Sequence, residues 1–234
     1  MYVFKINICL LFAILLTSCT SAVWVHRDFD SMKYNVQTIA VMPPQIEYSE
    51  RMAGSTEPKP EYNSKISKYT QAALNEALKE AGYIAKPVGL TDSASTNIQD
   101  STPCLTHSQK KAYSICDSIG KLKIKKETYK MNPEIGVLAE RTDADYLLFC
   151  HGKAFSTSEG REIVDAIFTG IKTGALRTFD PGPQKEGLSL ELLLVDANRA
   201  EAIWYNGNLE PKDLDPFSVS DIISLCESLL NSKL

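Results

Sequence analysis

Residues 188–206 read LSLELLLVDANRAEAIWYN, two apolar segments on either side of a short polar one. Segments 188–196 and 201–206 are rich in leucine, β-branched and aromatic residues, which is the composition of buried strands. Segment 197–200 contains asparagine and is short enough for a tight connection. We therefore predict an antiparallel hairpin over residues 188–206.

Further strands are predicted on the N-terminal side of this hairpin. Segment 144–155 (ADYLLFCHGKAF) is apolar in its first half, and 36–42 (VQTIAVM) is rich in β-branched residues. Segment 83–88 is a shorter candidate. Pro43 and Pro44 lack the backbone N–H that a strand needs, so we expect the second of these strands to end there and residues 45–62 to form a loop.

Helices are predicted where apolar residues recur every three or four positions. Four segments have this spacing or suitable end signals: 63–82, 108–122, 133–142 and 215–234. Segment 156–179 fits a helix face better than a strand and leads into a Pro-Gly-Pro break at 181–183. Because strands and helices alternate along the chain, the fold class is α/β, a mixed sheet of about five strands flanked by helices in a single domain.

The N-terminus has the three parts of a signal peptide. One lysine, Lys5, precedes an uninterrupted apolar run over 8–16, and small residues follow it. The run is shorter than the roughly 20 residues that a membrane-spanning helix needs. An ordinary secretory signal, an uncleaved anchor and a lipoprotein signal all fit these features.

The four residues Leu16-Thr17-Ser18-Cys19 resemble the lipobox of bacterial lipoproteins. The resemblance implies cleavage before Cys19 and acylation of this residue, which makes the membrane anchor practically permanent. Thr20 stands where an aspartate would retain enterobacterial lipoproteins in the inner membrane, so the resemblance favours the outer membrane, facing the periplasm. The expected organisation is a signal peptide over 1–18, a lipidated tether over 19–35 and a body over 36–234 with an insertion at 89–130.

Charge and cysteine content fit this location. Loss of residues 1–18, which hold one lysine and no acid, takes the formal net charge from −4 to −5. An acidic body argues against nucleic acid as a partner. Four cysteines remain beyond Cys19 in an oxidising compartment. We predict a disulfide between Cys104 and Cys116, which lie in a polar stretch, whereas Cys150 and Cys226 either pair or remain buried thiols.

A basic cluster and two aromatic residues are candidate contact points. Lysines are concentrated in the C-terminal part of the insertion, at Lys121, Lys123, Lys125 and Lys126. Such a cluster is either a solvated surface or a contact for acidic envelope polymer or lipid headgroups. In the tether, the aromatic residues Trp24 and Phe29 either dock on the body or lie at the membrane interface.

Three motifs, in this order, resemble a known group of envelope lipoproteins. They are 38–44 (TIAVMPP), 144–148 (ADYLL) and the pair 192–196 (LLLVD) and 202–204 (AIW). The group has a body like the N-terminal domain of TolB or the anticodon-binding domain, and it includes the curli secretion lipoprotein CsgG and the penicillin-binding-protein activator LpoB. The long 89–130 insertion and the Pro43-Pro44 pair depart from the pattern of the group.

The resemblance implies an interaction or assembly module for an envelope protein or a peptidoglycan-associated polymer. No GxSxG motif is present, and His26, His107 and His151 are far apart in sequence. We therefore expect no enzymatic activity, no cofactor and no metal. Two alternatives remain. One is a subunit of an oligomeric secretion channel, for which 156–179 is the only candidate spanning segment. The other is an uncharacterised hydrolase.

Overall fold

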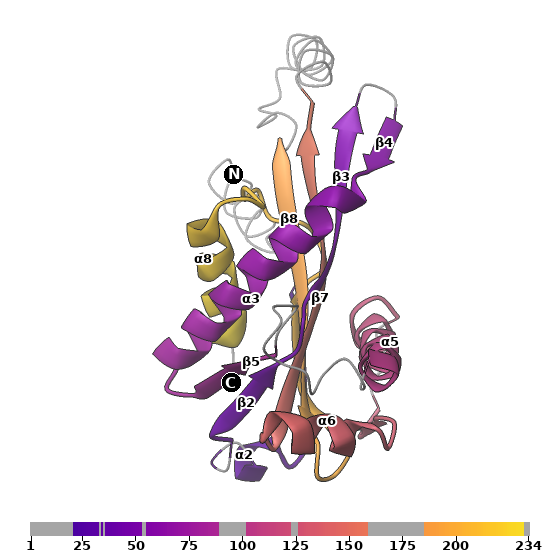
Figure 1. Cartoon of the computed structure of the whole chain (residues 1–234), viewed down its shortest axis with the longest axis vertical. Helices are drawn as coiled ribbons and strands as arrows, with labels where there is room; N and C mark the ends of the chain where they lie inside the picture. The colour runs from indigo at the N-terminus through magenta and orange to yellow at the C-terminus, as the bar shows by residue number, and fades with distance from the viewer. Residues whose placement is uncertain are drawn as a thin grey trace, which may run out of the picture.

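One mixed sheet lies at the centre of the molecule, with helices on both faces (Figure 1). The structure, a computed structural model, describes residues 21–32, 34, 36–52, 55–88, 102–122, 126–158 and 185–231. Neighbouring strands follow the order β1 (Ser21–Val25), β9 (Glu201–Asn208), β8 (Glu186–Asp196), β7 (Tyr146–Thr157), β2 (Thr38–Val41) and β5 (Ile84–Pro87). The α/β class is confirmed, but the described sheet has nine strands rather than about five.

The three strands β7, β8 and β9 form the antiparallel centre of the sheet. The predicted hairpin is confirmed as β8 and β9, with a register shift at Leu194/Val195. Side chains of β8 alternate between the two faces, and both faces are covered. Leu192 and Leu194 belong to the core under one helical layer, and Leu193 and Val195 to the core under the other. This double coverage explains why the strand is almost continuously apolar.

The prediction of a loop over 45–62 is wrong. Residues 45–52 form β3 (Gln45–Met52), which pairs in parallel with β7 and in antiparallel with β4 (Ser55–Pro58). Strand β2 pairs with an earlier part of β7, so β2 and β3 run along the same edge of β7. Pro43 and Pro44 interrupt the strand between them without redirecting the chain. The alternating polar residues of β3 are explained by its exposed position.

Two helical layers cover the sheet (Figure 1). On one face lie α3 (Asn63–Glu80) and α8 (Val219–Leu230). On the other lie α5 (Thr102–Gly120) and α6 (Ile135–Thr142). Short elements complete the described fold: α2 (Phe29–Met32), the 3₁₀ turn η2 (Pro60–Tyr62) and β6 (Tyr129–Lys130), which pairs with β9. Among the described residues, no helix combines the length and the apolar character needed to cross a membrane.

The predicted tether over 19–35 is wrong for its described residues, because they belong to the folded body. Strand β1 pairs with β9 along its whole length, from Ser21 opposite Asn208 to Val25 opposite Trp204. The Trp24 side chain is buried, its indole N–H donates to the Lys126 carbonyl at 3.2 Å, and its ring packs edge-on against Tyr129. Phe29 is also buried. Both aromatic residues therefore dock on the body.

The 89–130 insertion also contributes to the core. Its predicted helix is confirmed and extends further toward the N-terminus, as α5. Ala112, Ile115 and Ile119 of this helix pack on the sheet, so α5 is one of the two covering layers. Residues 89–101 and 123–125 lie outside the described residues. Of the predicted helix over 156–179, only 156–158 are described; residues 156 and 157 end β7.

The integration of β1 predicts a stability effect at Trp24. Replacing Trp24 by alanine removes a buried indole and one hydrogen bond, so we expect the free energy of unfolding to fall by about 3 kcal/mol. Val23→Ala in the same strand is the control, because the Val23 side chain is 37% exposed and its loss should cost less than about 1 kcal/mol. Urea unfolding followed by circular dichroism measures both. Equal, small effects would contradict the assignment of β1 to the body.

Candidate functional site

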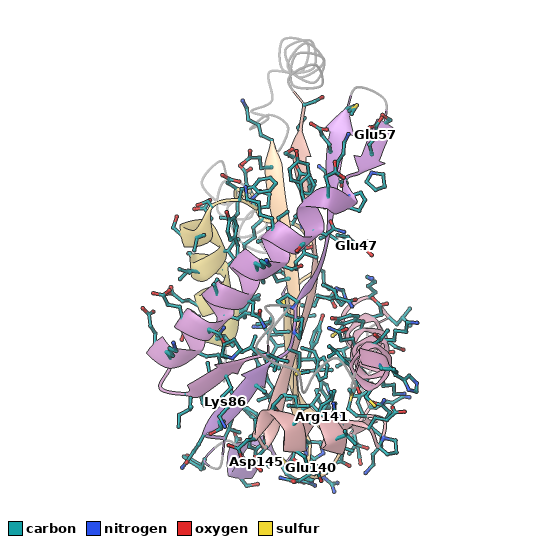
Figure 2. All side chains as sticks on the ribbon, in the orientation of Figure 1. Glu47, Glu57, Lys86, Glu140, Arg141 and Asp145 are labelled. Atoms are coloured by element: carbon teal, nitrogen blue, oxygen red, sulfur yellow. The ribbon has the colours of Figure 1, made fainter. Side chains whose placement is uncertain are left out.

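A groove of about 510 Å³ opens beside the start of β3. Its walls come from three places: the start of β3, the first turns of α3, and the facing surfaces of α5 and β7. The lining residues are Pro44, Gln45, Ile46, Glu47, Asn63, Ser64, Ser67, Tyr113, Asp117, Lys121, His151, Gly152 and Lys153. Figure 2 shows Glu47 on β3, at a level between the β4 hairpin and α5. Most of the lining residues carry polar side chains, which suits a hydrophilic ligand.

Asp117, His151 and Glu191 converge beside this groove. Their ligand-type atoms all lie within 4.8 Å of one another. His151 and Glu191 are direct cross-strand partners in β7 and β8, so their side chains share one face of the sheet. The His151 Nε2 and Glu191 Oε1 atoms are 3.9 Å apart. Asp117 reaches the pair from α5, the helix that covers this face. The three residues are far apart in the chain and meet only through strand pairing and helix packing.

The Glu191 carboxylate is buried, and the structure makes room for it. Glu191 is 6% exposed, and its Oε2 accepts a hydrogen bond from the Tyr205 hydroxyl at 3.1 Å. Gly207 lies opposite Glu191 in β9, where an added Cβ would be 3.0 Å from the Glu191 Cγ. A Cβ at Gly120 would be 2.5 Å from the Tyr205 hydroxyl oxygen. Burial, with the nearby Glu191 charge, raises the pKa of Tyr205, so its hydroxyl remains a donor.

The His151 imidazole is neutral at neutral pH. Burial lowers the pKa of His151 below its usual value, and the charges of Glu191 and Asp117 oppose this effect only in part. The Tyr113 ring packs edge-on against the imidazole with 4.8 Å between ring centroids. A neutral imidazole next to two carboxylates offers lone pairs to a ligand. This arrangement can accept hydrogen bonds from hydroxyl groups or hold a cation.

Lys121 and Lys126, the described members of the predicted basic cluster, have different roles. Lys121 pairs with Asp117 at 2.5 Å, and this hydrogen bond raises the pKa of Lys121. Its ammonium therefore belongs to the groove. Lys126 is exposed, its carbonyl accepts the Trp24 indole N–H, and its ammonium lies 5.9 Å from the centre of the Tyr129 ring. Lys123 and Lys125 lie outside the described residues. The predicted interaction surface of these four lysines therefore stays a prediction.

The predicted disulfide between Cys104 and Cys116 is wrong for this structure. Both residues lie in α5, twelve positions apart, which corresponds to about 18 Å along a helix. A disulfide needs Cα atoms within roughly 7 Å. All four described cysteines are free thiols. Burial raises the pKa of Cys116, Cys150 and Cys226, so these three are packed as small apolar side chains. Cys19 lies outside the described residues.

The cluster was missed in the sequence because each of its members is unremarkable alone. His151 has no other histidine near it in the sequence with which it could share a metal ion. The useful signal is Glu191, the single charged residue in the mostly apolar segment 188–195. A charge in a strand that is buried on both faces needs a partner. Local spacing could not identify Asp117 or Tyr205 as its neighbours.

Comparisons with known proteins identify no relative in sequence. No protein-family model matches the chain, and no curated protein matches it. Among solved structures, the chain is similar to the PelC dodecamer from Paraburkholderia phytofirmans, with 9% identity and a TM-score of 0.31, over 83% of this chain and 86% of that chain. A single-substitution variant of that protein aligns with the same identity and TM-score over 82% of its chain. At this TM-score the alignment supports no conclusion about fold or function.

The floor of the groove predicts an intolerant glycine. A Cβ at Gly152 would lie 2.1 Å from the Ser189 carbonyl oxygen, a backbone atom that cannot move aside without disturbing the β7–β8 pairing. We expect Gly152→Ala to lower the free energy of unfolding by about 1–3 kcal/mol. Gly136→Ala in α6 is the matched control, since nothing lies within 4 Å of its added Cβ and alanine favours a helix. Thermal unfolding measures the stability of both variants. If Gly152→Ala were as stable as the wild type, the tight contact with Ser189 would be contradicted.

Proposed function

We propose that this protein is a membrane-anchored envelope lipoprotein whose folded body binds an envelope protein or polymer. The observation that carries the proposal is the short distance between the lipobox cysteine and the fold. Strand β1 begins at Ser21, two residues after Cys19, and is hydrogen-bonded to β9 from its first residue. Two residues of extended chain span only about 7 Å. A lipid on Cys19 would therefore hold the body directly against the membrane surface, without a flexible linker.

The groove would then lie close to the membrane. Strand β1 is separated from β7, which forms the groove floor, by β9 and β8. Three strand spacings amount to about 14 Å. Ser21 lies opposite Asn208, and the neighbouring Gly207 lies opposite Glu191, so the anchor point and the polar cluster are at the same level of the sheet. A ligand in the groove would be one presented near the membrane surface.

The chemistry of the groove supports binding of a polar ligand. It offers a neutral imidazole, carboxylates and the amide of Gln45, which is itself held by Gln109 at 3.0 Å. These groups form hydrogen bonds with hydroxyl and amide groups, which are abundant in envelope glycans and in extended peptides. Recognition of this kind needs no chemical step. The absence of enzymatic activity expected from the sequence remains part of the proposal.

Lipidation predicts a defined mass for the membrane-extracted protein. Intact mass spectrometry should find a chain that begins at Cys19 and carries three acyl groups. Cys19→Ala should abolish both cleavage and acylation, because the modified thiol is absent. Cys9→Ala is the matched control. Cys9 lies in the apolar run of the segment that is cleaved off, so its substitution should leave the mature, acylated product unchanged. An unprocessed, unacylated wild-type chain would refute the lipid anchor.

The position of the groove predicts a membrane-dependent contact. A photo-crosslinking residue in place of Lys153, which lines the groove and is 64% exposed in its side chain, should capture an envelope component in intact cells. The same residue in place of Glu76, exposed on α3, is the control outside the groove. Because the contact depends on the anchor, Cys19→Ala should abolish the crosslink from position 153. Identical crosslinks from both positions, or from the unanchored protein, would contradict the proposal.

A further inference from the structure

We propose that Asp117, His151 and Glu191 form a binding site for a divalent transition-metal ion such as Zn²⁺, with an open coordination position toward the groove. The sequence predicted no metal, because its histidines have no local partners. The three donors come from α5, β7 and β8 and lie within 4.8 Å of one another. This inference goes beyond the proposed function and does not depend on the lipid anchor.

The donor atoms are slightly further apart than in a metal-bound site, and they could approach one another when the ion binds. Metal bonds of about 2.0–2.2 Å place tetrahedral donors roughly 3.5 Å apart. The His151 and Glu191 atoms are 3.9 Å apart and lie on paired strands of the rigid sheet. Asp117 is about half exposed at the edge of the cluster, so a change of its side-chain rotamer can complete the closure. Three protein ligands leave a fourth position for water or a ligand.

The donor set selects the class of ion. One imidazole nitrogen and two carboxylate oxygens suit Zn²⁺ and its neighbours among the transition metals. Ca²⁺ and Mg²⁺ prefer sites composed only of oxygen atoms. Because the open position would face the groove, a bound metal would present a Lewis acid to a groove ligand.

The Glu191 carboxylate supplies an independent observation in favour of a cation. In the part of the chain that the structure describes, Glu191 forms no ion pair with a lysine or arginine. Glu201 is equally buried at 6% exposure, yet it pairs with Lys130 at 2.5 Å and with Arg199 at 3.4 Å. A buried carboxylate without a directly paired counter-charge is costly. Of the described lysines, Lys121 acts on Glu191 electrostatically but is not directly paired with it, so a bound metal ion would supply a positive charge in direct contact.

Tyr205 holds this carboxylate in a suitable orientation. Its hydroxyl donates to Oε2 of Glu191 at 3.1 Å, which leaves Oε1 directed toward His151. Hydrogen bonds from residues behind the ligands are a regular feature of metal sites, because they fix ligand geometry. Gly120 and Gly207 leave the space in which Tyr205 and Glu191 meet. Tyr205 is therefore a positioning residue for the site.

Lys121 is the competitor of the metal. Its ammonium pairs with Asp117 at 2.5 Å and occupies one side of the cluster. Lys121 occupies Oδ1 of Asp117, and its positive charge opposes the binding of a second cation at the same carboxylate. Removal of the lysine charge should therefore increase metal affinity. A purely structural role for the cluster would not produce an effect of this sign.

Isothermal titration of Zn²⁺ into the chelator-treated, detergent-extracted full-length protein at neutral pH tests the site. We expect one equivalent to bind to the wild type. His151→Ala and Glu191→Gln should each lower the affinity at least about tenfold, and Lys121→Met should raise it. His107→Ala is the matched control. His107 also pairs with a glutamate, Glu134, at 3.0 Å, but it lies at the exposed surface away from the cluster. The Zn²⁺ affinity of this variant should equal that of the wild type.

Circular dichroism in the presence of chelator shows whether each variant is folded. If a ligand variant fails to fold, Lys121→Met still tests the proposal, because its side chain is about half exposed and tolerates substitution. Wild-type protein that binds no Zn²⁺, binding that persists in His151→Ala, or weaker binding in Lys121→Met would each overturn the proposed site.

Discussion

The antiparallel pairing of β7 with β8 is the constraint on which the other contacts of the molecule depend. It runs from Tyr146 opposite Asp196 to Ser156 opposite Glu186 and lies in the middle of the sheet. Because both strands carry apolar side chains on both faces, each face needs a covering layer. The layers are α3 with α8 and α5 with α6. Strand β1 extends this centre beyond β9 on one side, and β2 with β5 and β3 with β4 extend it beyond β7 on the other.

The polar cluster lies where the side chains on one face of the sheet, the face under α5, change from apolar to polar. On the face under α5, β7 presents Phe149 to the core and His151 two positions later to the groove. Strand β8 runs in the opposite direction. Its side chains on this face change from apolar to polar at the same level, from Leu193 to Glu191. Helix α5 ends at Gly120, immediately beyond Asp117. Helix α5 therefore ends at the level where the side chains of both strands become polar, and Asp117, His151 and Glu191 meet there.

The anchor and the groove are linked through the same sheet. Strand β1 continues the hydrogen-bonded ladder from β9, so a lipid on Cys19 would be attached to the body at an edge strand. The polar cluster lies on the strands further in, where backbone positions are held from both sides. A membrane-proximal ligand and a metal ion would thus meet His151 and Glu191 on central, paired strands of the sheet. The two proposals share His151 and Asp117, which line the groove and belong to the cluster. The metal site does not depend on the lipid anchor, so the two can be tested separately.

The sequence alone determined the α/β class, the 188–206 hairpin, the first part of β7 and the helices that cover the sheet. Those elements have strong apolar periodicity, which is a local property of the chain. Only the tertiary structure decided that residues 21–25 and 45–52 are strands. Residues 21–25 form a short segment next to polar residues, and residues 45–52 have a polar composition that resembles a loop. The meeting of Asp117, His151 and Glu191 was equally hidden, since strand register and helix packing join residues that are distant in sequence.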